Sequence, residues 1–234
     1  VELLILVMEA LAVYLLVLTA HALRKRFGLA HFYALLGGLT AIMSWVTDAG
    51  VKVEIGGLTF MVGSTVFYTS LLLGVFVVYV FDGSRPTRIA ISTVAGVSAM
   101  VPVIAMVLHY QMRLTGHPML AYVPMPGLRI NVASVLATVA DLIFLAMAWE
   151  FMGKPGWRMP LWLRSFLTLL GVMCLDVLLF STGAFAGRPE YFQIFKGTLL
   201  SRIVIAVFAG PLLYGYLRWQ NRRNGAEMEQ RPIL

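Results

Sequence analysis

The sequence LTFMVGSTVFYTSLLLGVFVVYVF at residues 58–81 contains no charged side chain. Polar residues bound it on both sides: Lys52 and Glu54 precede it, and the turn pattern Asp82-Gly83-Ser84-Arg85-Pro86 follows it. About 20 consecutive apolar residues are enough for a helix to cross the hydrocarbon core of a bilayer. The run is too long for a barrel strand and does not alternate strictly, so it predicts a transmembrane helix.

Runs of the same kind recur along the whole chain. Of its 234 residues, 60% are hydrophobic and 12% are charged, a charged fraction about half that of a soluble domain. We therefore predict an all-α integral membrane protein, a bundle of seven transmembrane helices. The expected ranges are Glu2–Leu23, Leu29–Gly50, Leu58–Phe81, Thr87–Met112, Ile130–Met152, Leu161–Ala184, and a last helix that starts between Tyr191 and Thr198 and ends near Gln220.

The basic residues are distributed unequally between the two sets of links. One set, with the C-terminal tail, carries twelve of the eighteen Lys and Arg residues, the other carries five, and Arg202 lies inside the last helix. Positively charged links stay on the cytoplasmic side of a membrane. The pattern predicts that the N-terminus lies outside and the C-terminus in the cytoplasm. Because the net charge of +7 sits mainly in these links, we expect no nucleic-acid partner.

Three ionisable residues inside the predicted helices are the candidate site. Asp141 lies midway along its helix, Asp176 about two-thirds along the next, and Arg202 lies in the last. A charged group at the centre of a span costs at least about 2.5 kcal/mol and often marks a functional site. We expect Arg202 to face one of the two aspartates, either to bind a ligand or only to fix the packing of the helices. Glu9 and Asp48 can reach an interface and favour the structural role.

Other reactive residue types show no functional spacing. The four histidines form no metal-ligand pattern, and a single His31 or His109 as a pigment ligand is a minor alternative to an interfacial role. No catalytic motif occurs, so we expect no enzyme activity, no metal site and no cofactor. Cys174 is expected to be a small core residue. The glycines Gly56, Gly57 and Gly63 are interpreted as helix packing or bends.

Six segments of the chain carry a family resemblance. They are Ser44–Asp48, which closes a helix with a polar residue, Val51–Gly57, a short amphipathic link, Ala140–Phe144 and Leu175–Phe180, each with an Asp before a Phe, Ser201–Ala206, with a basic residue nine positions before a Pro, and Pro211–Tyr214. From residue 41 to residue 219 the chain thereby resembles the vitamin uptake transporters, the family that includes the bacterial queuosine-precursor transporters.

The resemblance implies six core helices, uptake of a small heterocyclic metabolite such as a queuosine precursor or nucleobase, and substrate binding by Asp141, Asp176 and Arg202. Together with the helix ranges, it divides the chain into three regions: an additional N-terminal transmembrane helix (1–28), a six-helix transporter-like core (29–220) and a polar cytoplasmic tail (221–234). We expect a multi-pass protein of a bacterial or archaeal cytoplasmic (inner) membrane, with lipid and a small molecule as partners, alone or as a homo-oligomer or part of a larger membrane complex.

Two departures from the family pattern favour an alternative function. The helix at Tyr68–Phe81 is apolar until Asp82, whereas the family usually has acidic residues inside it, and the N-terminal helix is additional. The carrier function is therefore weighed against a seven-helix ligand-sensing or accessory subunit of a larger membrane assembly. The polar residues Asp141, Asp176 and Arg202 would serve either function.

Overall fold

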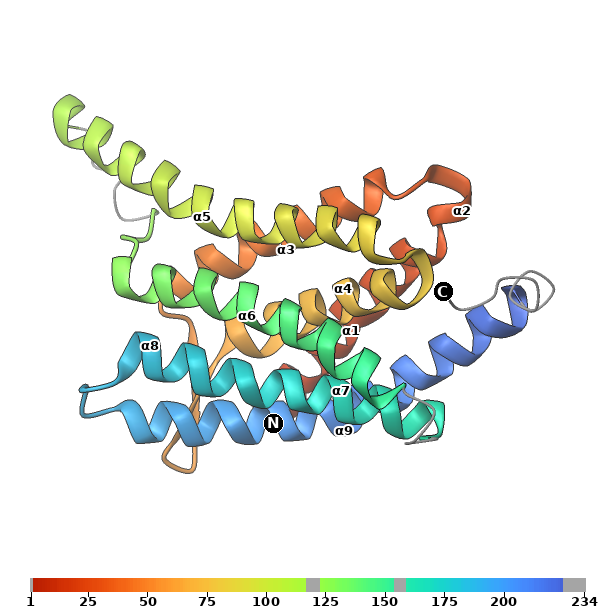
Figure 1. The fold of residues 1–234 in the computed structure, drawn as a ribbon. Helices are drawn as coiled ribbons and strands as arrows, with labels where there is room; N and C mark the ends of the chain where they lie inside the picture. Colours follow the sequence, from red (N-terminus) through yellow and green to blue (C-terminus); the bar gives the residue numbers. More distant parts are fainter. Residues whose placement is uncertain (1, 117–122, 154–158, 225–234) are drawn as a thin grey trace.

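The computed structural model describes residues 2–116, 123–153 and 159–224. Within them, seven helical stretches are long and apolar enough to cross a membrane. Figure 1 shows them packed as one bundle. The predicted seven-helix bundle is confirmed at this level, whereas its orientation in a membrane stays a prediction. The helical elements are α1 (Glu2–Ala22), α2 (Arg24–Phe27), α3 (Ala30–Asp48), η1 (Gly63–Tyr68), α4 (Thr69–Asp82), α5 (Ser84–Thr115), α6 (Leu128–Met152), α7 (Leu161–Asp176), η3 (Val177–Ser181), α8 (Thr182–Phe185) and α9 (Tyr191–Asn224).

The uncharged run forms the centre of the bundle. In the stretch Gly63–Asp82, 78% of the apolar window is buried, the largest share among the seven. Gly74 lets α1 and α3 approach this stretch closely, because a Cβ there would lie 3.1 Å from Val17 and 2.9 Å from Leu36. The α1 residue Val17 is completely buried in the same hydrophobic core. The division into an additional helix and a six-helix core stays a prediction, but α1 packs as part of one core.

A β-hairpin precedes the central helix. Strands β1 (Lys52–Ile55) and β2 (Leu58–Met61) pair antiparallel, with Ile55 opposite Leu58. Gly56 and Gly57 form the turn with φ values of 60° and 77°, which side chains other than glycine rarely adopt. The prediction of a helix starting at Leu58 is therefore wrong. Of the two interpretations of Gly56 and Gly57, helix packing is wrong and a bend in the chain is correct. Gly63, by contrast, does pack: a Cβ there would collide with Thr47 of α3.

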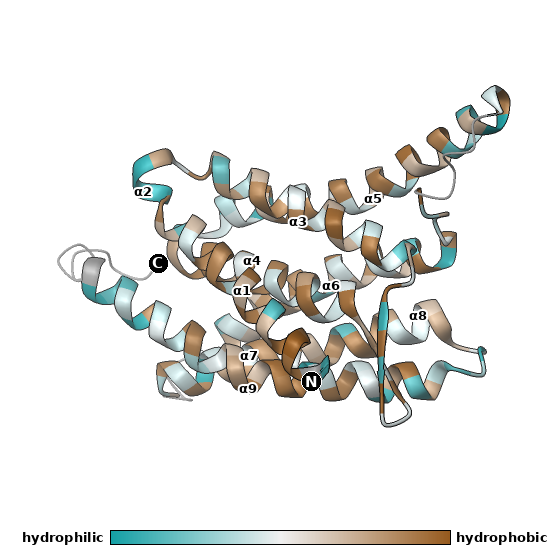
Figure 2. Cartoon of the chain, turned by 180° about the vertical axis from the view of Figure 1, so that it is seen from behind, coloured by the Kyte–Doolittle hydropathy of each residue, from teal (hydrophilic) through white to brown (hydrophobic). Residues whose placement is uncertain are grey.

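The polar segments gather at the two ends of the bundle. Figures 1 and 2 place α2 and the C-terminal part of α9 at one end, opposite the hairpin. We call the end with α2 the basic end, because α2 consists of Arg24, Lys25, Arg26 and Phe27. The opposite end is called the hairpin end. Helix α9 continues to Asn224, so the first residues of the predicted tail are helical; residues 225–234 lie outside the described part. The prediction of Cys174 as a core residue is wrong, since its side chain is exposed.

Candidate functional site

Arg202 lies completely buried on α9, and its guanidinium donates to three groups that belong to two residues. Its guanidinium donates to the carboxylate of Asp176, to the backbone carbonyl of Ser64 and, at 2.7 Å, to the Ser64 hydroxyl. A charge so far from water is stable only with such partners. The predicted pairing of Arg202 with an aspartate is therefore present, and Asp176 is the aspartate that binds it.

Both partners of Arg202 lie at interruptions of α-helical geometry. Ser64 belongs to the π-helical segment η1, and Asp176 is the last residue of α7 before the π-helical segment η3. Wider π-helical turns change which backbone groups pair within the helix and are frequent at functional sites. At the first of these turns, the backbone carbonyl of Ser64 accepts a hydrogen bond from Arg202 of α9. At the second, the Asp176 carboxylate contacts α9 and also lines a pocket inside the bundle.

Asp141 joins the same cluster through Tyr68. The Tyr68 hydroxyl donates to the Asp141 carboxylate, and the Arg202 guanidinium carbon lies 5.5 Å from the centre of the Tyr68 ring. Asp141 and Tyr68 are both buried. The structure thus brings together the three residues selected from the sequence, with Tyr68 and Ser64 as connecting residues that the sequence analysis missed. Whether the three bind a substrate stays a prediction.

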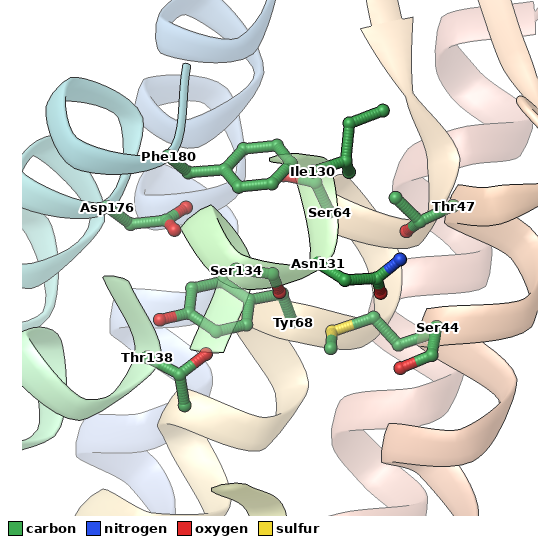
Figure 3. Close-up of a pocket in the computed structure, with 11 residues that line it drawn as sticks. Ser44, Thr47, Ser64, Tyr68, Ile130, Asn131, Ser134, Thr138, Asp176 and Phe180 are labelled. Carbon is green, nitrogen blue, oxygen red and sulfur yellow. The ribbon is translucent and has the colours of Figure 1, made fainter. Parts of the chain in front are cut away.

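A pocket opens beside this cluster, between α3, η1, α6 and the end of α7 (Figure 3). Its empty volume, including the open mouth, is about 400 Å³. It is narrow, because its interior admits little more than a water molecule. Asp176 lines the pocket, whereas Asp141 and Arg202 lie behind its wall. The lining consists of Met43, Ser44, Thr47, Ser64, Tyr68, Ile130, Asn131, Ser134, Thr138, Asp176 and Phe180.

Most of this lining can form hydrogen bonds, which is unusual inside an apolar bundle. Only Met43, Ile130 and Phe180 lack a hydrogen-bonding side chain. The buried Thr138 hydroxyl has no hydrogen-bond partner among the described residues. Buried polar atoms are nearly always paired, and those that are not call for an explanation. A wall of hydroxyls, one amide and one carboxylate suits a small polar molecule.

A wider hollow at the hairpin end leads toward the pocket. It has an empty volume of about 980 Å³ and shares Thr47 and Ile130 with the pocket lining. Charged residues surround it, among them Lys52, whose pKa is raised by the adjacent Glu54 carboxylate 2.8 Å away. We call this hollow the vestibule. It adjoins the pocket at the two shared residues, on the side of the hairpin end.

Asp48 lies where the vestibule meets the pocket and has a structural contact. Its carboxylate accepts bonds from the Asn131 side chain at 3.0 Å and the Gly127 amide at 3.4 Å. These bonds tie the end of α3 to the start of α6, as the structural interpretation of Asp48 expects. Glu9, by contrast, is exposed near the hairpin and takes no part in the cluster.

A second polar cluster closes the basic end. His21 contacts the Tyr216 hydroxyl at 2.6 Å and the Asp82 carboxylate at 2.8 Å. Arg24 donates to the same carboxylate at 2.9 Å, and Gln220 donates to Tyr216 at 2.9 Å. We call these five residues the basic-end cluster. They join α1 and α2, the end of α4, and α9, and four of them are buried.

The central helix contains no charged side chain before Asp82, but its first part carries hydroxyl groups that form contacts across the bundle. Ser64 accepts a hydrogen bond from Arg202, and Thr65 and Tyr68 donate to Ser201 and Asp141 in the other half of the bundle. The signal in the sequence was the string Gly63-Ser64-Thr65-Val66-Phe67-Tyr68-Thr69-Ser70, which puts five hydroxyl groups inside the apolar run. These hydroxyl groups link the central helix to the rest of the bundle without a charged side chain before Asp82.

These features define a class: a multi-span helical membrane protein with a polar pocket and a buried ion pair inside its bundle. A family model described as Vitamin uptake-like sensor matches residues 14–217, and the chain belongs to this family. The family resemblance noted in the sequence is thereby confirmed. No curated protein and no solved structure matches the chain significantly.

Proposed function

We propose that the chain is a membrane-embedded sensor of a small polar ligand. In this proposal the N-terminus lies outside, the C-terminus lies in the cytoplasm, and the ligand reaches the pocket through the vestibule. The observation that carries it is the position of Asp176, which lines the pocket and at the same time binds Arg202 of α9. A ligand that competes for this carboxylate changes the interactions of α9 directly.

The lining supports a neutral ligand with both hydrogen-bond donors and acceptors. Asp176 is the only carboxylate among the described residues of the lining and Arg202 already balances it, so a fully charged ligand would place an unpaired charge beside it in a medium of low polarity. The carboxylate accepts from N–H or O–H groups, and Asn131 and the hydroxyls donate to or accept from a ring carbonyl or nitrogen. A heterocyclic base, such as a queuosine precursor or nucleobase, meets these requirements and remains the predicted ligand class. Because the pocket is narrow, we expect its walls to separate on binding.

Two elements connect the pocket with the basic end. Helix α9 carries Arg202 in the site cluster and Tyr216 in the basic-end cluster, and the continuous η1–α4 stretch carries Ser64 and Asp82 in the same two places. Coupling between sites requires an element whose contacts at both places change together. Movement of α9 against η1–α4 would alter the site cluster and the basic-end cluster together. This connection supports a sensor, in which ligand binding at one cluster changes the contacts of the other.

Filling the pocket tests ligand binding. We expect Ser134→Trp to weaken binding by about 100-fold, because the ligand would have to displace the indole at a packing cost of roughly 3 kcal/mol, which corresponds to about that factor. Affinity would be measured by calorimetry on purified protein, after a thermal-shift screen of neutral heterocycles that includes nucleobases and deazapurines. Leu136→Trp is the matched control, because Leu136 lies on the same helix and is 66% exposed. Equal binding by wild type and Ser134→Trp would refute the pocket assignment.

Cysteine labelling tests the proposed orientation. After Cys174→Ser, a single cysteine at Gly57 in the hairpin turn should react with a membrane-impermeant reagent added outside intact cells. A cysteine at Gly225 should react only after the membrane is opened. The expectation follows from the twelve-to-five distribution of basic residues. External labelling at position 225 would reverse the topology and, with it, the side from which the ligand arrives.

A carrier is the second candidate. The observation that favours it is the presence of polar clusters at two depths, which would act as alternating gates around the pocket. Proteoliposomes decide between the two: a sensor binds the labelled ligand without accumulating it, whereas a carrier moves it into the lumen. Uptake abolished by Ser134→Trp and retained by Leu136→Trp would establish the carrier function for this same pocket.

A further inference from the structure

An apolar groove lies on the outer surface between α7 and α9, away from the pocket. Its lining is Trp162, Phe166, Val207, Gly210, Pro211 and Tyr214, and its empty volume is about 760 Å³. Val207 is 55% exposed and Trp162 is 52% exposed. Gly210 allows the ring of Phe166 to lie against α9, because a Cβ there would come within 2.9 Å of it. The groove thus offers a long apolar surface to the membrane.

The groove ends in a basic hollow at the basic end of the bundle. This hollow shares Trp162 and Tyr214 with the groove and adds Arg218, Asn221 and Arg222. The two arginines are four residues apart and so lie on one face of α9. Both are exposed, and neither forms an ion pair or hydrogen bond with a residue in the described part of the chain.

The start of α7 adds to the positive character of this hollow. Pro160 and Leu161 line it, and they mark the N-terminal end of the 16-residue helix α7. The free amide groups and the dipole at a helix N-terminus favour an anion. An apolar groove, an aromatic residue at its rim and an anion-binding hollow therefore follow one another along the bundle. This order matches the acyl chain, the interfacial region and the phosphate of a lipid.

We propose that this groove and hollow bind one anionic phospholipid. An acyl chain lies along Val207 and Phe166, and the headgroup phosphate contacts Arg218 and Arg222. Trp162 lies between them, where aromatic side chains are enriched at membrane interfaces. The predicted orientation puts the hollow at the cytoplasmic leaflet, where anionic lipids attract basic residues. The occupied helix face belongs to α9, which also carries Arg202.

The arrangement favours a lipid over a second copy of this chain. The exposed charges of the hollow are all positive, so two copies meeting through it would place arginines against arginines. A phosphate neutralises that charge, and its acyl chain fills the groove in the same molecule. The sensor or carrier function does not depend on this site, since no residue of the groove lines the ligand pocket.

Native mass spectrometry of the full chain in neutral detergent tests the proposal. Wild-type protein should bind phosphatidylglycerol in preference to phosphatidylcholine at one site. Arg218→Ala/Arg222→Ala should lower the affinity for phosphatidylglycerol roughly 30-fold, at about 1 kcal/mol for each basic residue. Val207→Trp should lower the binding of both lipids, because the indole fills the groove.

The control removes the same charge elsewhere. Arg85→Ala/Arg88→Ala changes two exposed arginines at the start of α5 and should leave the preference for phosphatidylglycerol intact. Three results would overturn the proposal: no preference in wild type, equal losses in the two double variants, or a two-chain mass that excludes lipid and is broken by Val207→Trp. The last result would assign the groove to a second copy.

Discussion

Arg202→Met should lower the free energy of unfolding by about 3–5 kcal/mol, the typical cost of removing one partner from a buried ion pair. The substitution leaves the Asp176 carboxylate without its cation and removes the donors to the Ser64 carbonyl and hydroxyl. Met is similar in length and apolar, so the loss measures the lost interactions more than a cavity. Reversible unfolding of purified protein in mixed micelles would give the free energy.

The matching variants separate pairing from packing. Arg202→Met/Asp176→Leu removes both charges and should recover part of the loss, because no charge is then left alone. Arg88→Met, at an exposed position, should change stability by less than about 0.5 kcal/mol. If the double variant loses more free energy of unfolding than Arg202→Met and Asp176→Leu lose together, the ion pair does not hold these helices together.

Gly197→Leu should lower the free energy of unfolding by about 3 kcal/mol, at the upper end of the usual overpacking range. Gly197 lies on α9 where β2 crosses it, and a Cβ there would collide with the carbonyl oxygen of Thr59. The obstacle is backbone, so no rotation of a side chain relieves it. The hairpin must separate from α9, and this separation also opens the wall of the vestibule.

The control for this prediction lies on the same helix. A Cβ added at Gly215 would meet no atom of the described residues within 4 Å, so Gly215→Leu should leave stability unchanged or raise it by up to about 1 kcal/mol through helix propensity. Limited proteolysis at the hairpin should accelerate in Gly197→Leu and not in Gly215→Leu. Equal stability of wild type and Gly197→Leu would mean that the hairpin does not rest on α9.

The helices could be predicted from the sequence because each has a local signal. Uncharged runs define their lengths, and Asp82-Gly83 ends α4 with a glycine at a φ of 87° that α-helical residues do not adopt. The hairpin was missed even though it also has a local signal. Polar and apolar residues alternate in Lys52-Val53-Glu54-Ile55, and the turn residues Gly56-Gly57 follow. The apolar residues of β2 continue directly into the central helix, so the predicted helix includes them.

The candidate site could be predicted only in part. Charges inside apolar runs identified Asp141, Asp176 and Arg202, since each carries a cost that is visible in the sequence. Their partners could not be found in this way, because a hydroxyl in a membrane helix costs little and is common. Tyr68 and Ser64 become part of the site only through the π-helical turns and the packing of the central helix against α9, which depend on the tertiary structure.

Helix α9 is long enough to work as a lever. From Arg202 to Asn224 it spans roughly 33 Å at about 1.5 Å per residue, with Pro211, which donates no backbone hydrogen bond, between the two points. A rotation of about 5° around Arg202 would therefore displace the far end by roughly 3 Å, by the same helix geometry. A tilt of a few degrees that follows a change of the Arg202–Asp176 contact would thus become, at the basic end, a displacement about as large as a hydrogen bond is long.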